Sequence, residues 1–285
     1  MEGPVSDEWW MLMITDAETD EVYGDLALHL LNEGRTAEIG YVLAPAFWGK
    51  GYAIEAANAL IEYLFDTVGV TRVMGFVHPD NRASAMVLER TGMLYEGQTQ
   101  LSYWVGDAPS DDVIYGMTRP DWETWRGRPR RAPDTVKLIE VTNANFRDVY
   151  SMETHRSQRS FVAPMPKSLS EALIAPSDPD DPTVPWYRAI EADGVIAGFA
   201  MVALPTPKDP EPYLWRLLID RMHQRRGIAS MALDLVESEM QALGYSTLIT
   251  SWIPGKGSPE AFYLDRGFEP TGEVDDGEIV GRKQL

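Results

Sequence analysis

Gln224-Arg225-Arg226-Gly227-Ile228-Ala229 is the stretch that decides the fold. It follows the apolar run Tyr213–Ile219, which is typical of a buried strand, and it opens a helical pattern that continues to about Leu243. The order is therefore strand, basic glycine-containing turn, helix. A helix start exposes unpartnered backbone N–H groups and carries partial positive charge, so this order is typical of a phosphate site. The simpler alternative is an ordinary helix start with two solvated arginines.

A second stretch of the same kind lies earlier in the chain. Trp48-Gly49-Lys50-Gly51-Tyr52-Ala53 follows a strand-like segment, residues 37–43, and opens another helical pattern. When Gly51 is aligned on Gly227, the flanking sequence matches with nearly equal spacing; the pairs are Leu43 with Ile219, Ala53 with Ala229 and Gly92 with Gly267. A repeated block with matched spacing predicts two copies of one fold.

Length, charge and cysteine content restrict the class of protein. The chain has 285 residues, a net charge of −19 and no cysteine. The length fits two domains, and the lack of cysteine excludes disulfides and thiolate chemistry and favours a cytoplasmic protein. No apolar run approaches the ~20 residues of a membrane span, so no membrane contact is expected. The acidic charge disfavours nucleic acid and attracts amine cations, although solubility alone also explains it.

Both blocks resemble the GNAT superfamily of N-acetyltransferases, whose pyrophosphate-binding signature is Gln/Arg-x-x-Gly-x-Gly/Ala. The second block, residues 224–229, matches in full, whereas the first has Trp48 at the Gln/Arg position. The first copy is similar to the branch that acetylates ribosomal-protein N-termini, through Glu38–Tyr41, the turn 48–53 and His78–Ser84. The second resembles bacterial spermine/spermidine (diamine) acetyltransferases, through Phe161–Pro164, Ser168–Ala172, Tyr213–Leu217 and Ala261–Tyr263.

The resemblance implies an α+β (α/β) fold of two tandem GNAT-type domains, each a mixed central sheet with flanking helices. We expect a first domain over residues 1–118, an irregular Arg/Pro-rich linker over 119–135 and a complete second domain over 136–285. In the family, a strand and two helices precede the first hairpin and wall the acceptor site. The first copy has only a few residues before its hairpin, so we expect it to lack these elements.

The resemblance also implies acetyl-CoA as the donor and a primary amine of a small molecule, such as a polyamine, as the acceptor. The expected acetyl-CoA contacts are Leu218, Ile219, Gln224, Arg225, Arg226, Gly227, Ile228 and Ala229 in the second copy, and Leu43, Trp48, Gly49, Lys50, Gly51, Tyr52, Ala53 and Asn81 in the first. The four histidines lie far apart, so no metal site is expected. By analogy with the family, the chain is a monomer or a homodimer.

Tyr263 is the expected acid of the second copy, because it occupies the family's tyrosine position one helical turn before Gly267. There it would protonate or hydrogen-bond the departing CoA thiolate. The alternative is a packed aromatic with a satisfied hydroxyl. For the base that deprotonates the ammonium we favour Glu211, acting through water; Asp220, Glu153 and Glu191 are the other candidates.

In the first copy the tyrosine position is Leu88, which cannot donate a proton. The ribosomal-type branch uses a serine in Asn-x-x-Ser, which Asn81 and Ser84 match, and Glu38 matches a carboxylate suggested as a base. Ser84 can also serve simply as a helix N-terminal residue. Two alternatives to catalysis by the second copy alone therefore stay open. The first domain acetylates a protein or antibiotic amine, or it is a non-catalytic domain that binds acetyl-CoA or only supports its neighbour.

Overall fold

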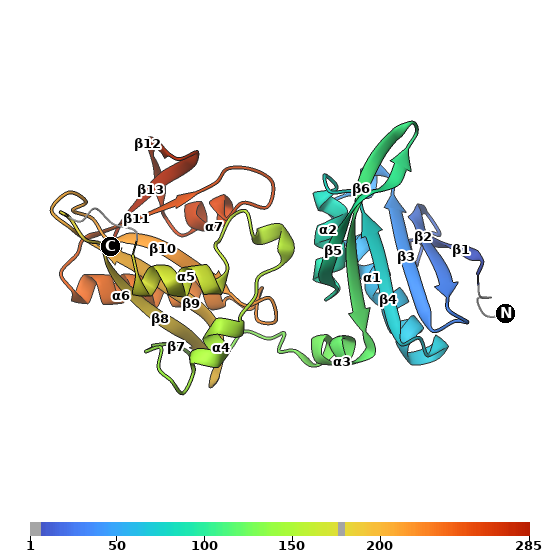
Figure 1. The fold of residues 1–285 in the computed structure, drawn as a ribbon, viewed down its shortest axis with the longest axis horizontal. Helices are drawn as coiled ribbons and strands as arrows, with labels where there is room; N and C mark the ends of the chain where they lie inside the picture. The colour runs from blue at the N-terminus through green and yellow to red at the C-terminus, as the bar shows by residue number, and fades with distance from the viewer. Residues whose placement is uncertain (1–6, 176–179) are drawn as a thin grey trace. The chain divides into compact units, whose positions relative to one another are not determined.

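The computed structural model describes residues 7–175 and 180–285. Its internal contacts divide the chain into a first unit that ends at Gly127 and a second that begins at Arg128. Figure 1 shows that each unit has its own central sheet with helices packed against it. The predicted class, two mixed α/β domains in tandem, is confirmed.

The first unit has a six-stranded sheet in the order β1-β2-β3-β4-β6-β5. All neighbouring strands are antiparallel except the central pair, β3 and β4. Helices α1 and α2 contact each other and the sheet. The elements are β1 (Trp9–Thr15), β2 (Val22–Leu31), β3 (Thr36–Leu43), α1 (Tyr52–Tyr63), β4 (Arg72–Val77), α2 (Arg82–Arg90), β5 (Leu94–Val105), β6 (Ala108–Thr118) and α3 (Arg119–Gly127), with short 3₁₀ and π turns at Pro45–Phe47 and Leu64–Val68.

The second unit has a seven-stranded sheet in the order β12-β13-β11-β10-β9-β8-β7. Its central pair, β10 and β11, is again parallel. The elements are β7 (Val136–Ile139), α4 (Phe146–Ser151), a 3₁₀ turn (Arg156–Gln158), α5 (Met165–Leu173), β8 (Val184–Ala192), β9 (Val195–Leu204), β10 (Tyr213–Ile219), α6 (Ile228–Ala242), β11 (Thr247–Trp252), α7 (Glu260–Asp265), β12 (Glu269–Asp275) and β13 (Glu278–Gln284).

Helices cover both faces of the second sheet. One core joins the sheet to α6, whose Ala232, Leu233 and Val236 are fully buried. A second core lies under α4 and α5, which contribute Val149 and Met165. Residues 7–127 contain no counterpart of β7, α4 or α5, which is the difference expected between the copies. Several large apolar side chains of the first sheet are accordingly exposed: Trp9, Met11, Met13, Val42 and Phe76.

The segment expected to be an irregular linker begins with a helix, which corrects the sequence-based expectation. Helix α3 occupies Arg119–Gly127 and belongs to the first unit. Trp122 and Trp125 are buried, and Trp122 stacks on Phe65 with ring centroids 5.1 Å apart. Pro120 does not oppose this helix, because proline is tolerated in the first turn. Only residues 128–135 connect the units without helix or strand.

We predict that Trp122→Ala destabilises the first unit by about 3–5 kcal/mol, because it removes a buried aromatic side chain and leaves a cavity. Hydrogen exchange on the intact chain should show faster exchange in residues 7–127 and unchanged exchange in the second unit. Trp104→Ala is the matched control, since Trp104 is 61% exposed. Equal exchange rates in the two variants would show that α3 is only an appendage.

Candidate functional site

The two glycine-containing turns have the same backbone geometry. Gly51 and Gly227 are the N-caps of α1 and α6, with φ of 92° and 79°. Two residues earlier, Gly49 and Arg225 also have positive φ, 75° and 61°. A Cβ atom added to either N-cap glycine would meet no atom within 4 Å. The helix N-termini are therefore open to an approaching anion, as a phosphate site requires.

The first side chain of each turn makes the same hydrogen bond although the residues differ. Gln224 donates its side-chain N–H to the carbonyl of Ile219 over 3.0 Å. Trp48, at the matched position, donates its indole N–H to the carbonyl of Leu43 over 2.7 Å. In both units this bond ties the turn to the end of the preceding strand. Trp48 therefore departs from the signature in residue type but makes the same hydrogen bond.

Arg226, one of the expected acetyl-CoA contacts of the second turn, is buried. Its Nε donates to the carbonyl of Arg131 over 2.7 Å, and a terminal nitrogen lies 3.6 Å from the Asp193 carboxylate. The guanidinium therefore fastens the start of the second unit to the β8–β9 hairpin. Arg225 is exposed, so the free side-chain charge of this turn comes from Arg225. Arg226 retains only its backbone N–H for a ligand.

The central strands of each unit separate at the same matched position. Strand β3 pairs with β4 through Glu38 opposite Met74 and no further. Strand β10 pairs with β11 through Leu214 opposite Thr250 and no further. Beyond these points the facing backbone groups of the two strands do not pair with each other. A gap lined by backbone N–H donors, beside an open helix N-terminus, is suited to bind an acyl group and stabilise negative charge on its oxygen.

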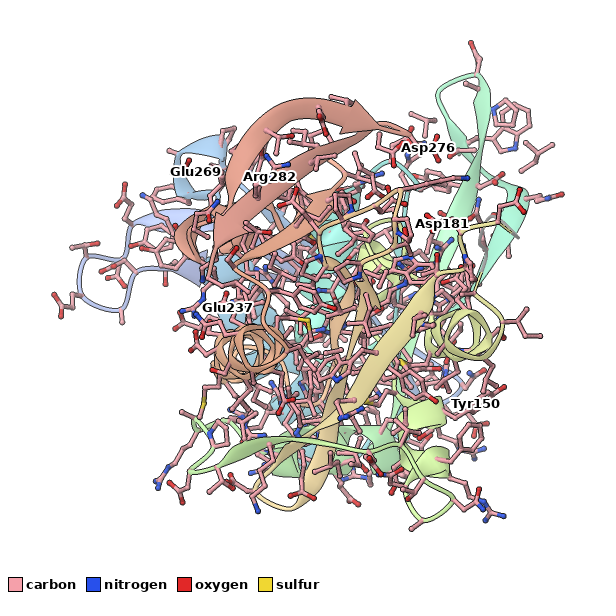
Figure 2. All side chains as sticks on the ribbon, turned by 90° about the vertical axis from the view of Figure 1, so that its left-hand side faces the viewer. Tyr150, Asp181, Glu237, Glu269, Asp276 and Arg282 are labelled. Carbon is pink, nitrogen blue, oxygen red and sulfur yellow. The ribbon has the colours of Figure 1, made fainter. Side chains whose placement is uncertain are left out.

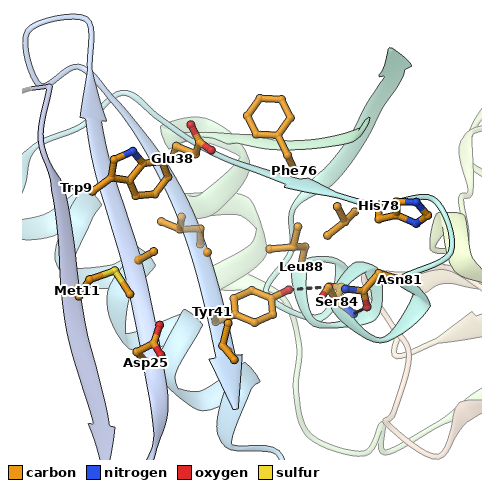
Figure 3. A pocket seen from close by; sticks show the side chains of 15 residues that line it. Trp9, Met11, Asp25, Glu38, Tyr41, Phe76, His78, Asn81, Ser84 and Leu88 are labelled. Atoms are coloured by element: carbon orange, nitrogen blue, oxygen red, sulfur yellow. Dashed lines mark hydrogen bonds between the residues drawn. The ribbon is translucent and has the colours of Figure 1, made fainter. Parts of the chain in front are cut away.

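In the first unit this gap opens into a cavity of ≈ 400 Å³ (Figure 3). The cavity brings together the predicted residues Glu38, Asn81 and Ser84. Asn81 caps α2 by accepting the backbone N–H of Ser84 over 3.1 Å. The Tyr41 hydroxyl donates to the Ser84 carbonyl over 2.7 Å, the bond drawn in Figure 3. Both contacts fix the start of α2, so they position Ser84 at the cavity wall.

Glu38 is the half-buried carboxyl of this cavity. Burial raises its pKa, the charge of His29 lowers it and that of Asp112 raises it. His29 lies opposite Glu38 on β2. A raised pKa improves a carboxylate as a proton acceptor. Leu88, at the family's tyrosine position, also lines the cavity and supplies no proton. The first unit thus has a candidate base but no tyrosine at the family's acid position.

In the second unit the reverse holds, because Tyr263 is present at the gap and Leu214 replaces the carboxylate. Tyr263 is 7% exposed and stacks on Trp252 with ring centroids 5.6 Å apart. Burial raises the pKa of Tyr263 to about 12, partly offset by a hydrogen bond with Thr250. Thr250 also donates to the carbonyl of Leu214 over 3.1 Å. The Tyr263 hydroxyl is therefore held protonated beside the last β10–β11 pair.

Glu211, the favoured base of the second unit, is engaged elsewhere. It precedes β10, at the end opposite the gap, and accepts from the Arg282 guanidinium at 2.7–3.1 Å. Figure 2 shows Arg282 on the β12–β13 hairpin. These bonds lower the pKa of Glu211. The carboxylate whose charge raises the pKa of Tyr263 is instead Glu278, at the start of β13, which only the strand register brings near Tyr263.

Residues 7–175 and 180–285 contain no cluster of three or more His, Asp or Glu that is able to hold a metal ion. In the same ranges, no helix has the length and apolar character needed to cross a membrane.

Two α/β units, each with separating parallel strands and an open helix N-terminus, define a pair of acyltransferase-type folds. The family model described as "Acetyltransferase (GNAT) domain" matches residues 2–94. The model described as "Acetyltransferase (GNAT) family" matches residues 138–268. The chain belongs to the GNAT acetyltransferase family and carries two of its domains.

Several relatives share part of the chain. It is 37% identical over 101 residues to the "Putative ribosomal N-acetyltransferase YdaF" of Bacillus subtilis, covering 35% of this chain and 55% of that protein. It is 32% identical over 88 residues to the "[Ribosomal protein uS5]-alanine N-acetyltransferase" of Escherichia coli, covering 31% and 45%. The chain thus spans about half the length of these relatives. A GNAT acetyltransferase structure from Bacillus anthracis is 29% identical, with a TM-score of 0.37 and coverage of 38% and 65%.

We predict that replacing Glu38 by glutamine makes the chain relatively more stable as pH rises. The raised pKa means that the folded state binds the Glu38 proton more tightly than the unfolded chain. The free energy of unfolding of the unchanged protein therefore falls as pH rises from the ordinary glutamate pKa through the raised value. Glutamine does not titrate, so the variant lacks this loss.

Urea denaturation at pH 4 and pH 8 measures the effect. Glu18→Gln is the matched control, because Glu18 is exposed in a turn and carries the same chemical change. The assignment of a raised pKa fails if the stability difference between Glu38→Gln and the unchanged protein is the same at both pH values.

Proposed function

We propose that this protein transfers the acetyl group of acetyl-CoA to a primary amine, and that the second unit performs the reaction. The observation that carries the proposal is the arrangement at the end of β10. The strand separates from β11 after Leu214, the turn 224–229 presents an open helix N-terminus, and Tyr263 lies beside the separation. In this proposal, the strand separation would hold the acyl group, the helix N-terminus would bind the phosphates and Tyr263 would stabilise the leaving thiolate of one substrate.

The donor would bind through backbone groups more than through side chains. The open N-termini at Gly51 and Gly227 would each suit the pyrophosphate of one CoA molecule, and the exposed Arg225 adds charge at the second. Leu218 and Ile219 lie on the unpaired part of β10, where their backbone would face the acyl chain. Because both turns share one geometry, we propose two acetyl-CoA sites per chain.

Tyr263 would act on the departing thiolate. A pKa of about 12 keeps the hydroxyl protonated at neutral pH, so it can donate a hydrogen bond as the C–S bond breaks. A group this weakly acidic contributes more by stabilising the thiolate than by full proton transfer. The acceptor is a small-molecule amine, a polyamine being one candidate, and the net charge of −19 would attract such a cation.

A second candidate function concerns the first unit. Its cavity gathers Glu38, Asn81 and Ser84, which supports transfer to a protein or antibiotic amine with Glu38 as base. The Escherichia coli relative is named as an alanine N-acetyltransferase of a ribosomal protein, and an acceptor of that kind fits this candidate function. Leu88 in place of tyrosine favours the alternative that this unit binds acetyl-CoA without turnover.

We predict that Gly227→Asp weakens acetyl-CoA binding at least tenfold. Aspartate tolerates the left-handed backbone of this N-cap, but it places a negative charge where the phosphates would lie. Gly227→Asn is the matched control, because asparagine has the same shape and backbone tolerance without the charge. Isothermal titration of acetyl-CoA measures affinity and stoichiometry.

The same pair of substitutions at Gly51 tests the first turn. Two sites, each lost with its own aspartate variant, are expected. One site that only Gly227→Asp removes would make the first unit structural. Equal affinity of the aspartate and asparagine variants at both positions would refute phosphate binding at these turns.

We predict that Tyr263→Phe lowers kcat about 100-fold and leaves acetyl-CoA affinity unchanged, because only the hydroxyl beside the leaving group is removed. Thiol release with spermidine, and with a peptide that begins with alanine, measures turnover. Tyr245→Phe, a partly buried tyrosine packed against the same core, controls for the general loss of a hydroxyl. A kcat equal to that of Tyr245→Phe would mean that Tyr263 is only a packed aromatic.

A further inference from the structure

Three polar side chains from three strands are linked by hydrogen bonds on one face of the second sheet, and this hydrogen-bonded row is called the Tyr213–Ser251–Glu278 chain. The hydroxyls of Tyr213 on β10 and Ser251 on β11 are 2.7 Å apart. Ser251 also donates to the carboxylate of Glu278 on β13. All three side chains are part-buried, so they are not sealed in the core of the second unit.

The direction of these bonds follows from proton counting. Ser251 has a single hydroxyl proton and gives it to Glu278. In the other bond, therefore, Tyr213 is the donor and Ser251 the acceptor. Both protons point along the chain toward the carboxylate, so a proton taken up at Tyr213 or Ser251 has a path that ends on Glu278.

These three hydrogen-bonded side chains lie next to the gap between β10 and β11. Ser251 is the first residue of β11 beyond the last β10–β11 pair. Because successive strand residues point to opposite faces, Ser251 lies on the face opposite Thr250, which contacts Tyr263. Ser251 thus lies at the gap on the face opposite Tyr263, and its partners Tyr213, on the paired part of β10, and Glu278, on β13, lie beside it. Burial raises the pKa of both Tyr213 and Tyr263, and the charge of Glu278 adds to the rise in each case.

We propose that Glu278, through Ser251, takes the proton from the acceptor ammonium in the second unit. This inference rests on the proposed function. The ammonium loses one proton to the Glu278 carboxylate by way of the Ser251 hydroxyl. The amine then forms the C–N bond at the thioester carbonyl carbon, and the C–S bond breaks. The second nitrogen proton passes to the departing thiolate with the help of Tyr263, so the products are the amide, CoA thiol and one proton on Glu278.

The other charged groups near this chain do not offer the same route. Arg216 and Asp275 both act on Tyr213 electrostatically. Arg216 is paired with Glu171 at 2.7 Å, and Asp275 lies opposite Glu278 in the β12–β13 hairpin. Glu211 is held by Arg282 at the other end of the strand. Of these carboxylates, only Glu278 accepts a hydrogen bond from a residue at the gap.

The substitutions Glu278→Gln and Ser251→Ala, each made in the intact protein, test the proposal. Each is expected to lower kcat/KM for the amine about 100-fold at pH 7 with acetyl-CoA affinity unchanged. Without a base, attack depends on the small fraction of free amine, which grows about tenfold per pH unit toward the ammonium pKa of about 10. The deficit should therefore shrink between pH 7 and pH 9.5, which a structural defect would not produce.

Glu273→Gln, an exposed glutamate of the same hairpin, is the control and should keep the activity of the unchanged protein. The inference is overturned if Glu278→Gln matches this control at every pH, or if Glu211→Gln alone shows the pH-dependent deficit. The proposed function fails separately, if the unchanged protein binds acetyl-CoA but releases no thiol with any amine, or if the turnover survives Gly227→Asp. If either Glu278→Gln or Ser251→Ala no longer binds acetyl-CoA, which indicates poor folding, the other variant still gives the pH dependence of kcat/KM.

Discussion

The separation of two parallel strands is the constraint on which both candidate sites depend. A parallel pair inside a sheet normally continues its ladder, because backbone groups left without partners inside a protein cost free energy. Here each pair stops at a matched position, Glu38 opposite Met74 and Leu214 opposite Thr250. The helix that follows each central strand begins beside the gap, at Gly51 or Gly227. Backbone donors from strand and helix thus face one space, whatever side chains surround it.

The two copies fill this shared frame with different chemistry. At the last paired position the first unit has Glu38 and the second Leu214. At the helix position beside the gap the first has Leu88 and the second Tyr263. The register also places Gly75 of the first unit where the second has Ser251, since each lies one residue beyond the last pair. The duplicated fold has therefore kept its backbone site twice while exchanging the polar side chains around it.

Much of this arrangement was predictable because it depends on local sequence. The turns, their glycines and the strands before them follow from composition and spacing, and the grouping of Glu38, Asn81 and Ser84 at one cavity agrees with the motif that named them. The failures concern long-range partners. Arg226 is held by Arg131 and Asp193, and Glu211 by Arg282, contacts that sequence spacing does not reveal.

The same limit hid α3, because Trp122 packs on Phe65, more than fifty residues away in sequence. The arginine and proline content of that segment predicted an irregular linker, whereas the spacing of the buried Trp122 and Trp125 fits the helix that is found. The contact between Glu278 and Ser251 was not predicted for a related reason, since only pairing of the last strand brings the two residues together. Side chains whose role depends on sheet register are thus the least accessible to a single sequence.

The bond from Trp48 to the Leu43 carbonyl has a consequence for how such turns are recognised. Gln224 makes the same bond to Ile219 with an amide, so the position selects any side chain with an N–H of suitable reach. A signature written as Gln or Arg specifies residue types, whereas the structure at this position requires only a side-chain N–H donor. Patterns that admit tryptophan at this position would recover duplicated or diverged copies that a strict residue pattern passes over.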